Sequence, residues 1–120
     1  MTHAVVSADD RTETSLRLSL TGEIDLSNAD DVENQILDHT SNQLSEVLVD
    51  LSGLTYLDSA GLRILFTLVT RMDTSQIGLE LVVPPDSPIN GAIQLTGLST
   101  VVPVLPAPRN RADRERPPPG

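Results

Sequence analysis

Short apolar segments alternate along the chain with longer segments whose apolar residues recur at helical spacing. From Ser15 to Leu20, polar and apolar residues alternate, which is the period-two pattern of a strand with one buried face. The apolar run Val47–Val49, rich in β-branched residues and extended to about Leu51, indicates a buried strand. Shorter apolar runs predict further strands at Ala4–Val6, Leu79–Val83 and Val101–Val102.

Three segments between these strands have the spacing of helices. The first begins at Ser27, a good N-cap residue, and its core stripe is Ala29, Val32 and Ile36. The second, which we call the central helix, runs from about residue 59 to residue 73. The third is short: Ser87-Pro88 provides a cap followed by proline at the first helical position, and Gly97 marks its end.

The order of these segments predicts an α/β fold. It is strand, strand, helix, strand, helix, strand, helix, strand, and no repeat or second domain interrupts it. We expect one domain over residues 1–106, with a mixed sheet of four to five strands and helices packed against it. The first two strands would be antiparallel, whereas helical crossovers make the later pairs parallel. Proline and charge dominate residues 107–120, which we expect to be a disordered tail.

The composition limits which cellular environments and which kinds of chemistry we expect for this chain. The 120 residues include no cysteine, which excludes disulfides and thiolate metal sites. The only histidines are His3 and His39, so histidine-based metal or nucleophilic chemistry is not expected. No apolar run approaches the length that spans a membrane, and the N-terminus lacks the pattern of a signal peptide. We therefore expect a soluble, cytoplasmic protein without a membrane partner.

The distribution of charge matters more than the net charge of −9. All eight basic residues are arginines, and four of them lie in the last dozen positions, so residues 1–108 carry 15 acidic residues against 4 arginines. Such a body repels nucleic acids and anionic lipids, and we expect neither as a ligand. The acidity would suit a basic protein partner, and it would equally serve solubility alone.

Enzymatic motifs are missing from the sequence. There is no Gly-x-Ser-x-Gly and no glycine-rich phosphate loop, and Asp58 beside Ser59 cannot activate that serine well without an imidazole. Asp25, Asp50 and Asp58 each end or follow a strand, but turn and capping roles explain them better than a metal site does. We expect no catalysis, no cofactor and no metal.

Ser59 is the candidate for chemical modification. It lies where a strand gives way to the central helix, in the run Asp58-Ser59-Ala60-Gly61, and its small neighbours would let a kinase approach. A phosphate there would meet the free amides and the positive end of the helix dipole. The alternative is that Ser59 is an ordinary N-cap, and these four residues alone favour that alternative.

The central helix offers a second candidate surface. Arg63, Thr67, Thr70 and Arg71 fall in one polar sector, and an apolar arc of roughly 200° covers the rest. Leu62, Leu65, Phe66, Val69 and Met72 form the centre of this arc, which Ile64 and Leu68 widen. The extra width has two explanations: packing against a neighbouring helix, or a partner surface beside Ser59.

The stretch Val47–Phe66, VLVDLSGLTYLDSAGLRILF, closely resembles the signature of the STAS domain of bacterial anti-anti-sigma factors (anti-sigma factor antagonists). The strand, the Asp-Leu-Ser-Gly link and the Asp-Ser-x-Gly-Leu helix start match in order and spacing. Gly22–Leu26 resembles the family's Gly-x-x-Asp element. Leu95–Leu98 followed by Val101–Pro103 resembles its C-terminal ending, so the resemblance covers about residues 4–106.

This resemblance implies a binding module without catalysis. In the family, the unphosphorylated protein binds an anti-sigma factor, often a serine kinase, and thereby releases a sigma factor for transcription. Phosphorylation of the serine equivalent to Ser59 switches binding off. The partner-binding residues that we carry over or infer are Asp25, Asp58, Ser59, Ala60, Gly61, Arg63, Ile64 and Leu68.

Two positions depart from the family pattern. Ala60 replaces a frequent second serine, which leaves Ser59 as the single acceptor, and Arg63 stands where a small residue is common. STAS-like domains also occur in anion transporters and as partners of lipid-transport ATPases. A free-standing subunit of a transport complex, without a serine switch, is therefore the alternative function. A domain that binds nucleotide directly would need a phosphate-binding glycine loop, which the sequence lacks.

Overall fold

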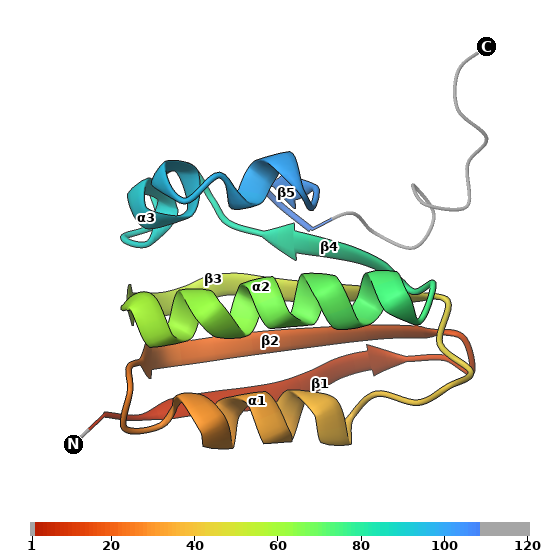
Figure 1. Cartoon of the computed structure of the whole chain (residues 1–120). Coiled ribbons are helices and arrows are strands. Elements are labelled where there is room, and N and C mark those ends of the chain that lie inside the picture. Colours follow the sequence, from red (N-terminus) through yellow and green to blue (C-terminus); the bar gives the residue numbers. More distant parts are fainter. Residues whose placement is uncertain (1, 109–120) are drawn as a thin grey trace, which may run out of the picture.

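The computed structural model describes residues 2–108, which fold into one sheet with helices along it (Figure 1). The elements are β1 (Ala4–Arg11), β2 (Ser15–Ile24), α1 (Ala29–Asp38), β3 (Glu46–Leu57), α2 (Ser59–Thr74), β4 (Gly78–Val82), α3 (Asn90–Leu95), the 3₁₀ turn η1 (Leu98–Thr100) and β5 (Val104–Leu105). The sequence predicted a disordered tail over residues 107–120. Residues 109–120 of this range lie outside the described part of the chain.

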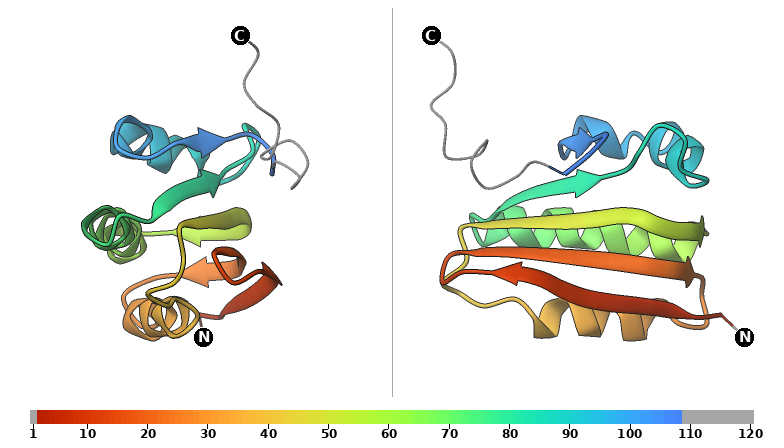
Figure 2. Two further views of the ribbon diagram at one scale, coloured as in Figure 1. Left: turned by 90° about the vertical axis from the view of Figure 1, so that its right-hand side faces the viewer. Right: turned by 180° about the vertical axis from the view of Figure 1, so that it is seen from behind.

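The sheet has five strands in the order β1-β2-β3-β4-β5. β1 and β2 are antiparallel, and the three later pairs are parallel. This confirms the predicted α/β fold with a mixed sheet. The helices lie along one face of the sheet, as the views in Figure 2 show. Right-handed crossovers between neighbouring parallel strands place successive helices on the same side.

β3 is longer than the apolar run predicted. It spans Glu46–Leu57, so the segment expected to link strand and helix is itself strand and pairs with β2 as far as Ile24. The pairing is irregular around Gly22 and Gly53. A Cβ at Gly53 would lie 2.5 Å from the Thr21 Cγ2 atom, which explains a glycine within this strand. The polar residues of the segment concealed its strand character because they occupy exposed positions.

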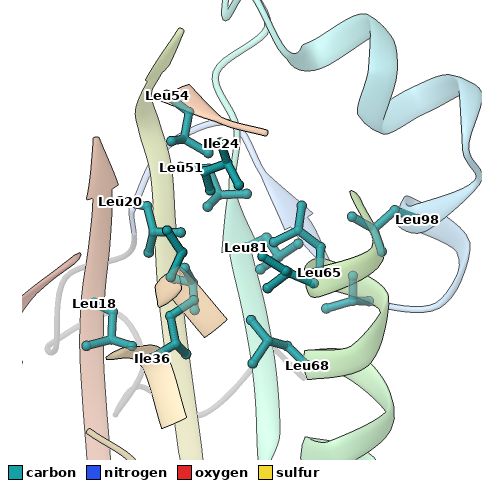
Figure 3. Packing of buried hydrophobic residues seen from close by; sticks show 14 of the residues in the cluster. Leu18, Leu20, Ile24, Ile36, Leu51, Leu54, Leu65, Leu68, Leu81 and Leu98 are labelled. Carbon is teal, nitrogen blue, oxygen red and sulfur yellow. The ribbon is translucent and has the colours of Figure 1, made fainter. Parts of the chain in front are cut away.

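The core lies between the sheet and the helices. Leu16, Leu18 and Leu20 of β2 are at most 2% exposed, as their alternation predicted. The predicted α1 stripe, Ala29, Val32 and Ile36, is also buried. Figure 3 shows buried leucines and isoleucines from β2, β3, β4, α1, α2 and η1 gathered in this layer. Leu48 of β3 is buried outside this cluster, consistent with the prediction that β3 is a buried strand, and Val82 of β4 is buried in the same way.

Several predicted boundaries were wrong. β1 and β2 are longer than predicted: β1 continues through the expected polar turn to Arg11, and β2 continues to Ile24, because pairing between the two strands holds polar residues in the sheet. α1 begins at Ala29 rather than at Ser27, and α3 begins at Asn90 rather than directly after Ser87. The last strand is Val104–Leu105, one step beyond the predicted Val101–Val102. Val102 is instead a core residue of the preceding turn. The Leu81 amide of β4 donates to the Pro103 carbonyl, and the Val83 amide, just beyond β4, donates to the Leu105 carbonyl. Val101 is 55% exposed whereas Val102 is buried, so apolar identity predicts neither pairing nor burial in this segment.

No helix within residues 2–108 is long and apolar enough to cross a membrane.

Candidate functional site

The ends of β2 and β3 meet at one edge of the sheet, and α1 and α2 begin there (Figure 1). α3 also lies at this end of the molecule in Figure 1. The Asp58 amide donates to the Ile24 carbonyl at 3.3 Å, which joins the two strand ends. In α/β sheets, this carboxyl edge is where loops and helix starts assemble binding sites.

Asp58 is the N-cap of α2. Its carboxylate accepts hydrogen bonds from the amides of Ala60 at 2.9 Å and Gly61 at 3.2 Å. Ser59 is therefore the first helical residue and not the cap that the sequence allowed. Ser59 is exposed, and its hydroxyl forms no hydrogen bond with any residue from 2 to 108. The capping function is thus separate from the candidate acceptor.

Ala60 and Gly61 hold the start of α2 against the strand ends. Both are buried, so neither offers a surface to a partner. A Cβ at Gly61 would lie 2.2 Å from the Leu57 Cδ1 atom and 3.2 Å from the Ile24 Cγ2 atom. Glycine at this position lets the helix approach the sheet closely, which presents Ser59 from a rigid support.

Asp25 is engaged in a local network at the start of α1. Its Oδ1 atom accepts from the Ser27 amide at 2.8 Å and from the Ser27 hydroxyl at 2.5 Å. Its Oδ2 atom accepts from the Thr2 hydroxyl at 2.5 Å. These bonds, that of the Ser27 hydroxyl first, lower the pKa of Asp25 below its ordinary 3.8. The carboxylate stabilises the turn before α1, a role that the family resemblance did not indicate.

The same hydrogen-bond pattern recurs at Asp50. The Asp50 Oδ1 atom accepts from the Ser52 amide at 2.9 Å and from the Ser52 hydroxyl at 2.6 Å. Asp-Leu-Ser therefore forms the same closed motif twice, around Asp25 and around Asp50. Asp25, Asp50 and Asp58 each have a local structural role, and within residues 2–108 no group of three acidic or histidine side chains is arranged to hold a metal ion.

The chain before β1 is fastened to the same edge. The Glu23 amide donates to the His3 carbonyl at 2.8 Å. Gly22 has a φ of 99°, in the left-handed region that favours glycine, and a Cβ there would lie 2.2 Å from the His3 carbonyl oxygen. The Gly-x-x-Asp element thus has a backbone reason for its glycine.

The predicted partner surface formed by Ile64 and Leu68 is wrong. Both side chains are 1% exposed and belong to the core, because α2 turns this side toward the sheet. The apolar residue that α2 exposes is Phe66, at 36%, which the pattern had assigned to the core. A helical wheel fixes the order of residues around a helix but not which side of a wide apolar arc is covered.

Arg63 projects from the exposed side of α2. Its Nη2 atom lies 3.7 Å from the Asp30 Oδ1 atom of α1, and the two side chains are 63% and 89% exposed. An ion pair with this exposure contributes little to stability. Arg63 is therefore available at the surface, as predicted.

Sequence reasoning missed the exposed apolar residues at this end of the molecule. Leu26, in the loop before α1, is 78% exposed, Tyr56 at the end of β3 is 49% exposed, and Leu95 at the end of α3 is 91% exposed. Leu26 and Tyr56 stand near the carboxyl ends of β2 and β3, and large apolar side chains exposed there are candidates for contact with a partner. The helical spacing had assigned Leu95 to the apolar stripe of the third helix, which its exposure contradicts, and no periodic pattern marked Leu26 or Tyr56 as exposed.

Comparisons with known proteins agree with this architecture. A family model described as "Mlab, STAS domain" matches residues 7–105. A crystal structure of an anti-sigma factor antagonist from Mycobacterium paratuberculosis is 25% identical, with a TM-score of 0.76 over 88% of this chain and 87% of that chain. No curated protein matches the chain in sequence.

Two other structures share the fold. The anti-sigma factor antagonist SpoIIAA in its unphosphorylated form is 13% identical, with a TM-score of 0.68 over 92% of each chain. The Bacillus cell fate determinant SpoIIAA in the phosphorylated form is 18% identical, with a TM-score of 0.67 over 93% of this chain and 100% of that chain. At these identities the similarity is one of fold.

Proposed function

Because the chain belongs to the STAS-domain family, we propose that it is an anti-sigma factor antagonist that Ser59 phosphorylation switches off. In the unphosphorylated state it binds an anti-sigma factor of the serine kinase type in the cytoplasm and so releases a sigma factor. The observation that carries the proposal is the exposed Ser59 hydroxyl at the first position of α2, which makes no hydrogen bond within residues 2–108. The similarity to an anti-sigma factor antagonist at a TM-score of 0.76 supports the class of partner.

The site around Ser59 accounts for a switch in binding without a change in fold. Asp58 already accepts from the Ala60 and Gly61 amides, so a phosphate on Ser59 would not need these donors and would project outward. It would add a charge of about −1.5 to −2 beside an existing carboxylate. A partner that buries this surface would have to desolvate that charge, which is costly when the charge is unpaired. The helix dipole makes the same charge tolerable in the free protein.

The exposed side chains of Leu26, Tyr56 and Leu95 provide the apolar part of the binding surface. Asp25, Ala60 and Gly61 act indirectly, since they shape the loop and the helix start on which the exposed residues stand. This division separates residues that touch the partner from residues that position them.

Affinity capture from the native cell tests the proposal, with wild type, Ser59→Ala and Ser59→Asp as baits. Wild type and Ser59→Ala should retain the anti-sigma factor, whereas Ser59→Asp should bind it at least tenfold more weakly. Mass spectrometry of the protein from cells should find phosphate on Ser59.

Ser75→Asp is the matched control, because it places the same substitution in an exposed position at the other end of α2. It should leave binding unchanged. If Ser59→Asp binds as tightly as wild type and no phosphate is found on Ser59, the switch is refuted. Capture of transporter components by all of these variants would favour the alternative, a subunit of a transport complex, for which the exposed apolar residues suffice.

A further inference from the structure

The outer face of α2 differs in chemistry from the rest of the domain. Residues 1–108 contain only four arginines, and two of them, Arg63 and Arg71, lie on this one helix face. Together with Phe66, Thr67 and Thr70 they line a shallow hollow of about 290 Å³. We call these five residues the α2 outer face.

Both arginine side chains are exposed and available to bind a ligand. Arg63 has the exposed contact with Asp30 at 3.7 Å, and Arg71 forms no ion pair with any residue from 2 to 108. Phe66 lies between them along the helix and is 36% exposed, and no other residue of α2 places a large apolar side chain on the surface. The Thr70 hydroxyl donates to the Phe66 carbonyl at 3.2 Å, which leaves the arginines as the face's strong donors.

The spacing of the two arginines defines what they can bind. Eight residues of α-helix separate their Cα atoms by about 12 Å along the axis. An extended peptide covers that distance in about four residues, so carboxylates spaced by about four residues could reach both guanidinium groups. Arginine binds carboxylates through two parallel donors, which favours such a ligand over a neutral one.

A larger apolar hollow adjoins this face. Its volume is about 620 Å³, it is lined mainly by apolar residues of α2, β4 and the segment before β5, and Thr70 is common to both hollows. Val101, which contributes to its wall, is 55% exposed. A segment held by the arginines would therefore have room to place an apolar side chain beside them.

We propose that the α2 outer face is a docking surface for a short acidic peptide segment of a partner protein. Carboxylates of the segment pair with Arg63 and Arg71, and an apolar side chain packs on Phe66. Charge complementarity selects this occupant, because Arg63 and Arg71 line the same hollow on one helix face and guanidinium groups pair with carboxylates. The proposal does not depend on Ser59 phosphorylation.

Nuclear magnetic resonance titration of the ¹⁵N-labelled full chain tests this surface. The probe is a capped hexapeptide with two glutamates on each side of a leucine pair, and the reference is the same peptide with glutamines. The acidic peptide should shift amide signals across residues 63–71, and the glutamine peptide should bind at least threefold more weakly. Arg63→Gln/Arg71→Gln should weaken the acidic peptide about threefold to tenfold.

Arg11→Gln is the matched control for charge, since Arg11 is an exposed arginine elsewhere whose side chain donates to the His39 carbonyl. It should change the affinity less than twofold, and its effect should stay below that of the single variant Arg71→Gln. Three outcomes would overturn the proposal: no binding of the acidic peptide at millimolar concentration, equal binding of the glutamine peptide, or equal weakening by Arg11→Gln. These measurements use unmodified protein, so a failed Ser59 switch would leave them unaffected.

Discussion

α1 and α2 start at the same edge of the sheet, yet the serine near each helix start differs in its hydrogen bonding. Before α1, Asp25 and Ser27 are separated by one residue, and the Ser27 hydroxyl is bound to the Asp25 carboxylate at 2.5 Å. At α2, Asp58 and Ser59 are adjacent, and the carboxylate reaches past the serine to the amides of Ala60 and Gly61. Both serines are exposed, but only the Ser59 hydroxyl is free of hydrogen bonds to described residues.

This difference shows that spacing, rather than residue type, decides which serine is available. The Asp-Leu-Ser motif closes on itself at Asp25 and again at Asp50, with nearly the same distances. At Asp58 no residue intervenes before the serine; the aspartate caps α2, and the Ser59 hydroxyl makes no hydrogen bond to a residue from 2 to 108. Substitution at Gly61, where α2 packs closely on the sheet, should change stability most. Substitution of Ser59, whose hydroxyl makes no hydrogen bond within residues 2–108, should change it little.

The largest effect is expected from Gly61→Ala. Its Cβ would lie 2.2 Å from the Leu57 Cδ1 atom, so α2 or Leu57 must shift, and we expect a loss of about 1–3 kcal/mol in the free energy of unfolding. Urea denaturation measures this loss. Gly91→Ala in α3 is the control, because a Cβ there meets nothing within 4 Å. It should be neutral or stabilising, and equal losses at the two glycines would contradict the tight start of α2.

Loss of the cap is expected to come next. Asp58→Ala removes the acceptor of two amide hydrogen bonds and should cost about 0.5–2 kcal/mol in the free energy of unfolding. Asp58→Asn retains a carbonyl oxygen as acceptor and should cost less. Thermal unfolding followed by circular dichroism compares the two. If they are equally destabilising, the capping bonds do not account for the role of Asp58.

A smaller effect separates the two serines. Ser59→Ala breaks no hydrogen bond to a described residue and should change the free energy of unfolding by about 0.5 kcal/mol or less. Ser27→Ala removes a donor to Asp25 and should lower the melting temperature more than Ser59→Ala does. Calorimetry of both variants measures this. The reverse order would mean that Ser59 has a structural role that the geometry does not show.

The smallest effect concerns pH. The pKa of Asp25 is lower in the folded chain than its ordinary 3.8, so its carboxylate contributes stability above that pH. The contribution is lost as the pH falls through the lowered pKa. Carbon-detected titration of the Asp25 carboxyl should show that Ser27→Ala raises its pKa toward 3.8, more than Thr2→Ala does. An unchanged pKa in Ser27→Ala would remove Ser27 as the main cause.

Much of the fold could be predicted because it depends on periodicity. The alternation from Ser15 to Leu20 and the stripe of Ala29, Val32 and Ile36 appear in the structure as buried faces, since local patterns determine which side of an element is apolar. The end of β3 could not be predicted in this way. Its strand character comes from pairing with β2, a contact between residues far apart in the chain.

In the candidate site, too, features set by local sequence were predicted, and features set by contacts between distant residues were not. Ser59 was predicted to lie exposed in the first turn of α2, and the structure confirms this placement. The burial of Ile64 and Leu68 and the exposure of Phe66 depend on how α2 is rotated against the sheet. That rotation is set by close contacts such as the one at Gly61, which no single-helix pattern contains.

The order of the strands in the sheet also bears on how the chain folds during synthesis. Every strand pairs only with strands that are its neighbours in the chain, from β1 to β5. A growing chain can therefore complete each strand pairing as soon as the next strand emerges. No strand has to be inserted later between two strands that are already present. The turn between β1 and β2 is short, whereas each parallel pair is joined through a crossover that contains a helix and must close a longer loop. During synthesis, β1 and β2 are the first pair of strands to be complete, and the two-residue β5 is the last strand to be added.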